Sequence, residues 1–402
     1  MTFGRHLLDE RLLDPAITYL NHPTVGATPR RVLAAQRSIQ DEIERQPSRF
    51  LLRELTGVIV GAWRPERPRL RVAADHVASF VGASGDDLVF VDNTTTGANA
   101  VLRSFPFEPG DEILVSDLGY GGVVLAATYA ARERGATVRT AAIPTPYSSE
   151  GIADAFEQAV RPRTRLAIVD HIAAEAAIIL PLADIAARLR RRGVFVLADG
   201  AHVPGSLALD VPSLGVDWYV ANLHKWAFVP RSSGFLWVSP QRQAALHPAV
   251  ISWGLDQGMT MEFDLVGTRD PSPYLAAPAA FSFIDELGGL AAIHAYTHDL
   301  SWRGAQLLAQ RWGTPFDTPK VLVGSMASVM LPSELGSTRE DAAHVRDALL
   351  FEDKIEVQVH VTRERLHARV SAQVYNDISD YERLADAVAN RAARANRIGS
   401  SA

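Results

Sequence analysis

The chain has 402 residues, of which 47% are apolar and 21% are charged, and its formal net charge is −6 at pH 7. This composition provides ample material for a folded core and excludes a disordered, collagen-like or disulfide-stapled chain. The slight excess of acid, with no long run of Lys or Arg, argues against nucleic acid as a partner. The absence of cysteine excludes thiolate metal sites and any protein thiol as nucleophile, and we expect no metal.

The N-terminal sequence carries no targeting or membrane-spanning signal. Charged residues, among them Arg5, Asp9 and Arg11, stand where a signal peptide would have an apolar core. No stretch approaches about 18 uninterrupted apolar residues, the length of a membrane-spanning helix. We therefore expect a cytoplasmic protein.

The first half of the chain predicts alternating strands and helices. A first helix is expected with Thr28 as its N-cap and Pro29 at its first position, because apolar residues then recur at helical spacing up to Ile43. Continuous apolar strands separated by Ala-rich helices predict an α/β protein with a mostly parallel central sheet flanked by helices. The predicted strands cover residues 88–91, 113–115, 138–142, 166–169, 194–198, 218–221 and 234–238.

The pattern changes after about residue 271, where helices over 276–287 and 291–311 precede β-rich runs at 355–361 and 366–371. We read this part as a smaller α+β C-terminal domain. The expected division is an N-terminal segment (1–28) that packs on the small domain, a large domain (29–270) and the small domain (271–402). A break at 314–319 and the polar tail after Arg391 are the expected mobile pieces.

Polar residues follow several predicted strands, and ligands of parallel sheets gather at that edge. They are Asn93, Asp117, Asp170 and Asp199, and Lys225 also stands just past a strand. This edge of the sheet is the predicted site.

The segment from Asp92 to Gly97 lies between a strand and a helix and contains Thr94, Thr95 and Thr96. Free N–H groups and the helix dipole favour a phosphate there, although plain N-capping by Asn93 or Thr94 explains the same residues. The chain has neither a Gly-x-Gly-x-x-Gly loop nor a P-loop, so the anion would be a single phosphate.

Asp199 and Lys225 form the second part of the predicted site. A carboxylate after a buried strand needs a positive partner to stay charged, although such residues often serve only as caps or loop anchors. Lys225 lies among the apolar side chains of Leu223, Trp226 and Phe228, and desolvation of its amine lowers its pKa and favours Schiff-base chemistry. Together these parts match pyridoxal 5′-phosphate (PLP): the phosphate at the threonines, the ring nitrogen at Asp199 and the aldehyde at Lys225.

Two motifs, Asp199-Gly200-Ala201-His202 and Leu223-His224-Lys225-Trp226, resemble the class V aminotransferase family of PLP enzymes. The nearest branch is the isopenicillin N epimerase-like proteins, and the resemblance implies fold type I. Further matching segments cover residues 19–22, 267–270 and 369–376.

The resemblance also implies roles for individual residues. Tyr120 would stack on the cofactor ring, with an ordinary half-buried tyrosine as the alternative. Arg369 would bind the substrate α-carboxylate, with a surface ion pair as the alternative. Thr268 would reach the phosphate of a neighbouring subunit, which implies a homodimer. The catalytic set would be Lys225, Asp199, Tyr120 and His202; His224 would lie near the phosphate, and Asn21 and His22 would bind substrate.

The chain departs from the family pattern at two places. Residues 173–176 read Ala-Ala-Glu-Ala where relatives tend to carry a polar stretch, which implies a missing hydrogen bond to the phenolic oxygen of the cofactor. Pro23 replaces a glycine and restricts His22 to extended backbone. Both departures argue against a simple transfer of the substrate of the epimerase.

The expected reaction begins with removal of an α-proton by Lys225. Return of the proton from the opposite face gives an epimerase or racemase, with Tyr120 or His202 as the possible second base. Loss of a β-substituent instead gives a C–S lyase. Transamination also remains open. A persulfide-forming desulfurase needs a cysteine and is excluded. A non-catalytic PLP-fold binding protein is the alternative of another class, and a nicotinamide oxidoreductase lacks its glycine-rich fingerprint.

Overall fold

Seven strands form the central sheet in the computed structural model, which describes residues 2–57 and 65–399. The strand order is β2-β8-β7-β6-β5-β3-β4, and β8 alone runs antiparallel to its neighbours. The expected mostly parallel sheet is confirmed. Its strands are β2 (Leu88–Val91), β3 (Glu112–Ser116), β4 (Thr137–Ala141), β5 (Thr164–Asp170), β6 (Phe195–Asp199), β7 (Trp218–Asn222) and β8 (Gly234–Val238).

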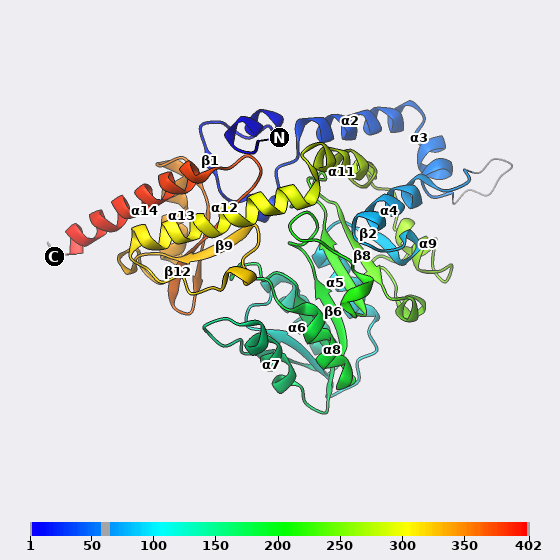
Figure 1. Ribbon diagram of the computed structural model, residues 1–402. Helices are drawn as coiled ribbons and strands as arrows, with labels where there is room; N and C mark the ends of the chain where they lie inside the picture. Colours follow the sequence, from blue (N-terminus) through cyan, green and yellow to red (C-terminus); the bar gives the residue numbers. More distant parts are fainter. Residues whose placement is uncertain (1, 58–64, 400–402) are drawn as a thin grey trace.

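Helices cover both faces of this sheet (Figure 1). Along β5, Leu166 and Ile168 join one apolar cluster, and Ala167 and Val169 join the other. Because side chains of a strand alternate between faces, burial on both sides requires the continuous apolar pattern seen in the sequence. The first cluster includes α5 (Thr94–Ser104) and α6 (Gly121–Glu133); the second includes α4 (Arg69–Phe80), α7 (Ser149–Ala159) and α8 (Leu182–Arg191).

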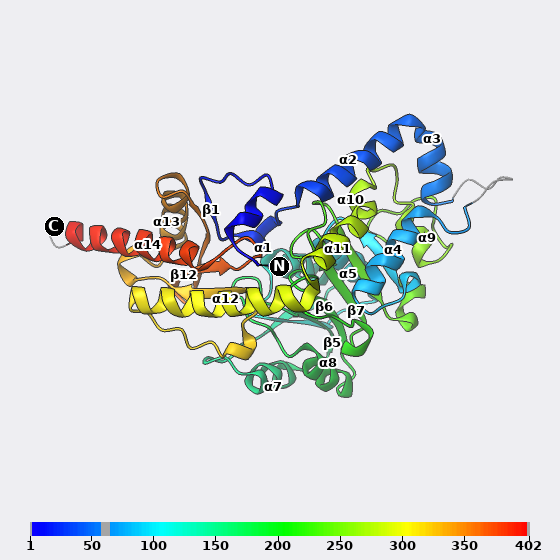
Figure 2. The same ribbon diagram turned by 45° about the horizontal axis from the view of Figure 1, so that its top comes forward.

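A smaller antiparallel sheet, β11-β12-β9, forms the C-terminal part together with three helices. Its strands are β9 (Met326–Met330), β11 (Gln358–Thr362) and β12 (Arg365–Ser371). Helices α12 (Gly289–Trp312) and α14 (Ile378–Gly399) lie side by side in both views (Figures 1 and 2), and α13 (Arg339–Phe351) packs on β11. The polar tail after Arg391 continues α14 to Gly399, whereas 400–402 lie outside the described residues.

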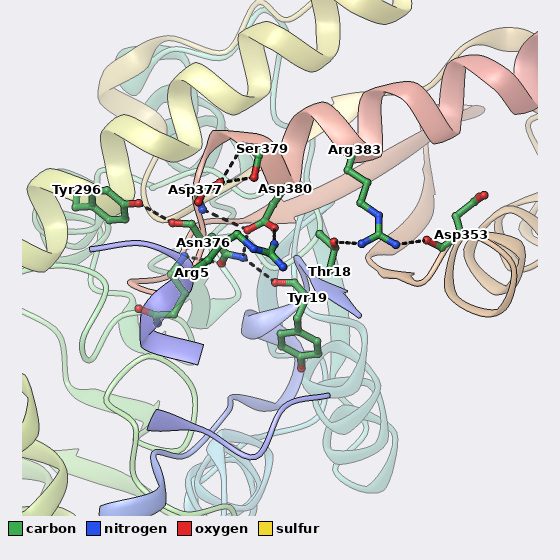
Figure 3. Close-up of polar contacts among 11 residues, drawn as sticks. Arg5, Thr18, Tyr19, Tyr296, Asp353, Asn376, Asp377, Ser379, Asp380 and Arg383 are labelled. Carbon is green, nitrogen blue, oxygen red and sulfur yellow. Dashed lines mark hydrogen bonds and ion pairs between the residues drawn. The ribbon is translucent and has the colours of Figure 1, made fainter. Parts of the chain in front are cut away.

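The N-terminal segment bridges the two parts of the molecule. Strand β1 (Thr18–Tyr19) pairs with β10 (Ile355–Glu356), and Arg383 donates to Thr18 Oγ1 at 3.0 Å. Asn376 donates to the Tyr19 carbonyl at 3.1 Å, as Figure 3 shows. Leu20 belongs to the apolar cluster of the small part, but Leu7 belongs to that of the large sheet.

Helices α10 (Ser272–Leu275) and α11 (Ala277–Glu286) pack on α4 and on α2 (Arg30–Arg45). Phe281 of α11 stacks on Phe80 of α4 with 4.2 Å between ring centroids. These helices therefore share the core of the large sheet, although the sequence assigned them to the small domain. The domain boundaries stay predictions, and this packing favours a boundary within α12.

Short elements complete the described chain, and Pro29, not Thr28, occupies the N-cap position of α2. They are η1 (Arg5–Glu10), α1 (His22–Val25), α3 (Pro47–Arg49), η2 (Phe50–Leu55), η3 (Gly85–Asp87), η4 (Pro212–Leu214), η5 (Pro240–Ala245), α9 (Met259–Asp264), η6 (Lys320–Leu322) and η7 (Ser333–Leu335). Within residues 2–57 and 65–399 no single helix has both the length and the apolar composition to cross a membrane; only α10 to α12, joined across a 70° bend, meet both conditions.

Candidate active site

The carboxyl ends of β5, β6 and β7 face the start of α5 across a cavity of about 470 Å³. The sheet brings these segments together because parallel strands end at the same edge. Most of the predicted site residues line this cavity. The lining residues are Thr24, Asn93, Thr94, Thr95, Thr96, Tyr120, Asp170, Ala174, Asp199, Ala201, His202, Asn222, His224 and Lys225.

Lys225 extends into the cavity from the loop that follows β7. Its Nζ lies 3.2 Å from Nε2 of His202. Burial, assisted by the positive charge of Arg369, lowers the pKa of the amine to about 7, while Asp199 acts in the opposite direction. A neutral amine is therefore available near neutral pH, as a nucleophile or a base requires.

Asp199 ends β6 with one carboxylate oxygen unpaired. Oδ1 accepts the N–H of Ala201 at 2.9 Å, whereas the buried Oδ2 has no hydrogen-bond partner among the described residues. Burial raises the pKa of this carboxyl, and the charge of Lys225 opposes the shift. An orphaned buried acceptor is costly, and a pyridinium N–H is a donor that would satisfy it.

Gly200 makes the turn after Asp199 possible. A Cβ at this position would lie 2.2 Å from the hydroxyl oxygen of Tyr219, whose hydroxyl bonds Nδ1 of His171 at 3.0 Å. Any larger residue would therefore displace Tyr219 or the turn that follows Asp199.

The first turn of α5 is capped by two asparagines. Asn93 Oδ1 accepts the N–H of Thr96 at 2.9 Å, and Asn222 Oδ1 accepts the N–H of Thr94 at 3.0 Å. The capping alternative is thus observed, and in the described part of the chain the N–H of Thr95 remains for an anion. The sequence analysis missed Asn222, although the rule of polar residues at strand ends applied to it equally.

Tyr120 forms the rim of the cavity and is 47% exposed. Its backbone N–H donates to Oδ1 of Asp170 at 3.3 Å. Asp170 is the direct register partner of Asp199, and burial followed by the charge of Asp199 raises its pKa well above the usual range. Stacking of Tyr120 on a cofactor stays a prediction.

Arg369 is buried on β12 and forms no ion pair in the described residues. Its Nη1 donates to the Ala174 carbonyl at 2.8 Å, and its Nη2 donates to Thr24 Oγ1 at 2.7 Å and to Asn21 Oδ1 at 3.3 Å. Burial lowers its pKa to about 10, so it stays charged at neutral pH. The surface ion pair considered as an alternative is not observed. Arg369 is not among the residues that line the cavity, and its buried Nε has no hydrogen-bond partner among the described residues.

Asn21 and His22 do not line the cavity, and His22 begins helix α1 (His22–Val25), so the extended backbone expected for it before Pro23 is not observed. His22 bonds the hydroxyl of Tyr375 at 2.9 Å and the backbone carbonyl of Lys225 at 3.0 Å, and burial lowers its pKa to about 3. Asn21 donates to Glu356 at 2.8 Å and accepts from Arg369. These polar atoms hold the backbone of Lys225 and the side chain of Arg369. Substrate contact by Asn21 and His22 stays a prediction.

The remaining two predicted residues differ in their placement. His224 lines the cavity, with Nδ1 2.7 Å from the Ser233 carbonyl, and burial lowers its pKa to about 4. Thr268 lines a different pocket of the same chain, beside Trp253 and Tyr274. Its contact with a cofactor across a dimer interface stays a prediction.

The family model described as "Aminotransferase class-V" matches residues 68–331. The chain belongs to this family. It is 31% identical to "Probable L-cysteine desulfhydrase, chloroplastic" of Arabidopsis thaliana over 93% of this chain and 83% of that protein. It is 32% identical to "Isopenicillin N epimerase" of Streptomyces clavuligerus over 94% and 95% of the two chains.

Solved structures share the fold of this class V aminotransferase. The cystine C–S lyase C-DES superposes with a TM-score of 0.75 at 24% identity, over 93% of this chain and 97% of that chain. A cysteine desulfurase from Thermococcus onnurineus NA1 superposes with a TM-score of 0.77 at 19% identity, over 96% and 97%. Fold type I, expected from the motifs, is confirmed.

The protein is therefore a PLP-dependent enzyme, and its residues fit the cofactor. Asp199 Oδ2 would take the ring N–H, Lys225 would take the aldehyde, and the start of α5 would take the phosphate. Bound there, PLP withdraws electrons from the α-carbon of an amino acid. The non-catalytic role that the sequence kept open is not supported. A nicotinamide oxidoreductase, against which the missing glycine-rich fingerprint already argued, is not supported either.

Proposed function

We propose that this enzyme is an epimerase or racemase that acts at the α-carbon of an amino-acid-like substrate. The observation that carries the proposal is the Lys225 amine, whose pKa of about 7 makes it a base at neutral pH beside the unpaired oxygen of Asp199. The relative named isopenicillin N epimerase, similar over nearly its whole length, supports the same reaction.

The chain supplies groups for three tasks in this reaction. Arg369 binds the α-carboxylate in a buried position, where a charge-assisted hydrogen bond is strong. Lys225 takes the α-proton, and His202, 3.2 Å from Nζ, holds the amine by a hydrogen bond. Burial, followed by the charges of Lys225, Arg369 and His224, keeps the pKa of His202 well below its usual value, so its ring is neutral and can accept.

Inversion also requires a proton donor on the opposite face. Tyr120 at the rim of the cavity is our candidate, because its phenol carries an O–H that can donate and its side chain is half exposed. Its exposure allows the phenol to exchange its proton with solvent between turnovers.

β-Elimination is the second candidate, and the relatives named L-cysteine desulfhydrase favour it. It uses the same carboxylate clamp and the same base. The chain contains no cysteine, so sulfur would leave without passing through a protein thiol.

Two measurements separate these functions. Amino acids are incubated with the PLP-loaded enzyme in deuterated water and followed by NMR and chiral chromatography. α-Deuteration with inversion supports the epimerase, and keto acid with ammonia supports elimination. Formation of only the pyridoxamine form of the cofactor would contradict both.

We also propose that the active enzyme is a cytoplasmic homodimer in which Thr268 reaches the cofactor of the second subunit. Several apolar side chains between β8 and α9 are exposed, notably Trp253 at 84%, Val250 at 58% and Ile251 at 54%. An apolar group of this kind is typical of an interface, and Thr268 and Trp253 line the same pocket.

A further inference from the structure

Arg11 is a buried cation that forms no ion pair within residues 2–57 and 65–399. The residue follows η1 and is 1% exposed. Its Nη1 donates to the Leu7 carbonyl at 3.0 Å, whereas its Nε and Nη2 have no hydrogen-bond partner among the described residues. Burial lowers its pKa to about 10, so the guanidinium stays charged at neutral pH. A buried charge without a partner is costly, and the groups around Arg11 indicate what this charge does.

Three aromatic rings surround the guanidinium in place of a carboxylate. Its Cζ atom lies 4.6 Å from the ring centroid of Tyr375, 5.0 Å from that of Phe228 and 5.6 Å from that of Phe283. The face of an aromatic ring attracts a cation, so these contacts offset part of the cost of burial. Tyr375 follows β12, Phe283 belongs to α11, and Phe228 stands in the loop that carries Lys225. These three rings, which we call the aromatic cage, therefore join the N-terminal segment to that loop.

The backbone of Phe228 is strained and depends on the packing around it. Its φ angle is 62°, a left-handed conformation that a bulky residue rarely adopts. Such a conformation persists where neighbouring groups hold it. The Phe228 ring is buried against Arg11, His22 and Phe283. The aromatic cage thus helps to fix the loop just beyond Lys225.

Tyr375 links the aromatic cage to the backbone of Lys225 through His22. The Tyr375 hydroxyl lies 2.9 Å from Nδ1 of His22, and Nε2 of His22 lies 3.0 Å from the carbonyl oxygen of Lys225. A carbonyl can only accept, so Nε2 carries the ring hydrogen. Burial, followed by the charge of Arg11, lowers the pKa of His22 to about 3, so Nδ1 is unprotonated and accepts the Tyr375 O–H. The hydrogen bonds therefore run in one direction, from Tyr375 through His22 to Lys225.

The charge of Arg11 favours this direction in two ways. The cation lies over the Tyr375 ring and draws electron density from the phenol, which strengthens the hydroxyl as a donor. It also repels a second proton from the His22 ring. Burial raises the pKa of Tyr375 well above the usual range, so the hydroxyl keeps its own proton. Each effect stabilises the arrangement in which His22 donates to Lys225.

The bond from His22 is the one hydrogen bond to the backbone of Lys225 within the described ranges. The N–H groups of Leu223 and His224, by contrast, both donate to the Ser233 carbonyl. The N-terminal segment also packs directly on this loop, because a Cβ at Gly26 would lie 1.9 Å from the His224 carbonyl oxygen. The position of the Lys225 backbone, and with it that of the amine, thus depends on the segment that contains His22.

We propose that Arg11 and Tyr375 are positioning residues, which act through His22 to hold Lys225 where its amine can react. Neither residue lines the active-site cavity. Their effect on the reaction therefore passes through the backbone of Lys225. This inference rests on the proposed function, in which Lys225 is the base and the attachment point of the cofactor.

Nitrogen-15 NMR of the cofactor-free protein with labelled histidine tests the hydrogen-bond pattern directly. His22→Gln identifies the signals of His22, and we expect its Nε2 to be protonated and its Nδ1 to be unprotonated. Tyr375→Phe should move the Nδ1 signal toward that of a free acceptor, and Arg11→Met should move it part of the way. The matched control is Arg242→Met, which removes a cation from the ring of Phe195 at 4.1 Å and should change neither signal.

The rate at which cofactor-free enzyme captures PLP measures the position of the amine. Borohydride quenching at about pH 9, above the lowered pKa of the amine, makes the rate report placement and not ionisation. Tyr375→Phe should slow capture by about tenfold or more, because small displacements of a reacting group are costly. Arg11→Met should slow it by about threefold or more, and Arg11→Lys should restore part of the rate because lysine is also a cation.

A double variant tests whether Arg11 acts through Tyr375. If it does, Arg11→Met in the Tyr375→Phe background should slow capture no further, since two changes in one chain of contacts are not additive. Melting temperatures show whether each variant is folded. Should Tyr375→Phe fail to fold, the Nδ1 signal and the capture rate of Arg11→Met decide the question.

Several outcomes would overturn the inference. A protonated Nδ1 of His22 in the parent protein would show that the hydrogen bonds do not run as proposed. An unchanged capture rate in folded Tyr375→Phe or in Arg11→Met, or a further loss in the double variant, would exclude the positioning role. Absence of borohydride-stable attachment at Lys225 in the parent would contradict the proposed function instead. Normal attachment in the parent with unchanged rates in the variants would contradict only the inference.

Discussion

At the scale of single residues, the site depends on charges that the fold holds out of water. The Lys225 amine has its pKa lowered to about 7 by burial, and the Asp199 carboxyl has its pKa raised by burial. Both shifts follow from desolvation of the charged form. Each group is thereby prepared for a partner that the chain itself does not supply.

The first prediction concerns Lys225 as base and covalent attachment point. Lys225→Ala should remove borohydride-stable attachment of the cofactor and lower α-proton exchange by about 100-fold or more, the usual contribution of a general base. Deuterium incorporation and peptide mass mapping measure the two effects. Lys320→Ala is the control, since Lys320 is exposed on η6. Exchange that survives in Lys225→Ala would mean that another base acts.

The pH dependence of cofactor capture follows from the lowered pKa. Only the neutral amine attacks an aldehyde, so the capture rate of cofactor-free enzyme should rise about tenfold per pH unit below about pH 7 and level off above it. Arg369→Gln removes a positive charge that lowers this pKa, so the midpoint should move to higher pH. Borohydride quenching at set times measures the rates. A midpoint that stays near 7 in this variant would contradict the electrostatic coupling.

Asp199→Asn should have opposite effects on the free and the loaded protein. Removal of a desolvated charge should stabilise the cofactor-free protein by about 1 kcal/mol, whereas the gain in stability on adding PLP should shrink. Thermal denaturation with and without PLP measures both. A variant that PLP stabilises as strongly as the parent would show that Asp199 does not bind the ring nitrogen.

At the scale of elements, the cavity exists because strands, turns and helix starts meet at one sheet edge. Strand β6 ends in Asp199 and strand β7 ends in Asn222. Helix α5, which follows β2 in the chain, begins at Thr94. Asn222 joins two of these elements through its bond to the Thr94 N–H. The turns between elements therefore fix the positions of the site residues.

The turn at Gly200 gives a prediction at this scale. Gly200→Ala should lower the free energy of unfolding by about 1–3 kcal/mol, the cost of overpacking, because the added methyl would collide with Tyr219. Chemical denaturation measures the change. Gly121→Ala is the matched control, since a Cβ there meets nothing within 4 Å. Equal stability of the two variants would show that the turn relaxes easily.

At the scale of the whole molecule, three segments far apart in the chain converge on the active site. The N-terminal segment contributes His22 and Thr24, the large sheet contributes Lys225 and its neighbours, and the small sheet contributes Arg369. A second cavity, of about 530 Å³, lies between the loop after β4 and the small sheet. Both cavities are therefore formed where the two parts of the molecule pack together.

The proposed dimer is tested at this scale. Trp253→Glu should convert the dimer to a monomer and weaken PLP binding, because a charge would replace the most exposed of the apolar side chains near Thr268. Light scattering after gel filtration and cofactor titration measure the two effects. Val321→Glu, an equally drastic change at an exposed valine of η6, should change neither. An unchanged dimer in Trp253→Glu would place the interface elsewhere.

Local pattern alone was sufficient for the large sheet and its edge. Strands buried on both faces must be continuously apolar, and a polar residue directly after such a strand must lie at its end, so Asp199 and Lys225 were identifiable from neighbouring letters. The sequence analysis did not predict helices α13 and α14. Their many charged residues made these segments resemble a polar loop and a polar tail.

The sequence by itself therefore determined which polar residues stand at strand ends and, through motifs that resemble the class V aminotransferases, the fold family and the cofactor, because strand ends and motifs are both visible in neighbouring residues. Only the tertiary structure decided that His22 holds the backbone of Lys225, that Asn21 holds Arg369, and that Arg365 faces a second cavity. Those relations join residues hundreds of positions apart. Burial and hydrogen bonding, which decide whether a polar atom is engaged or available, are properties of the packed chain and not of its local sequence.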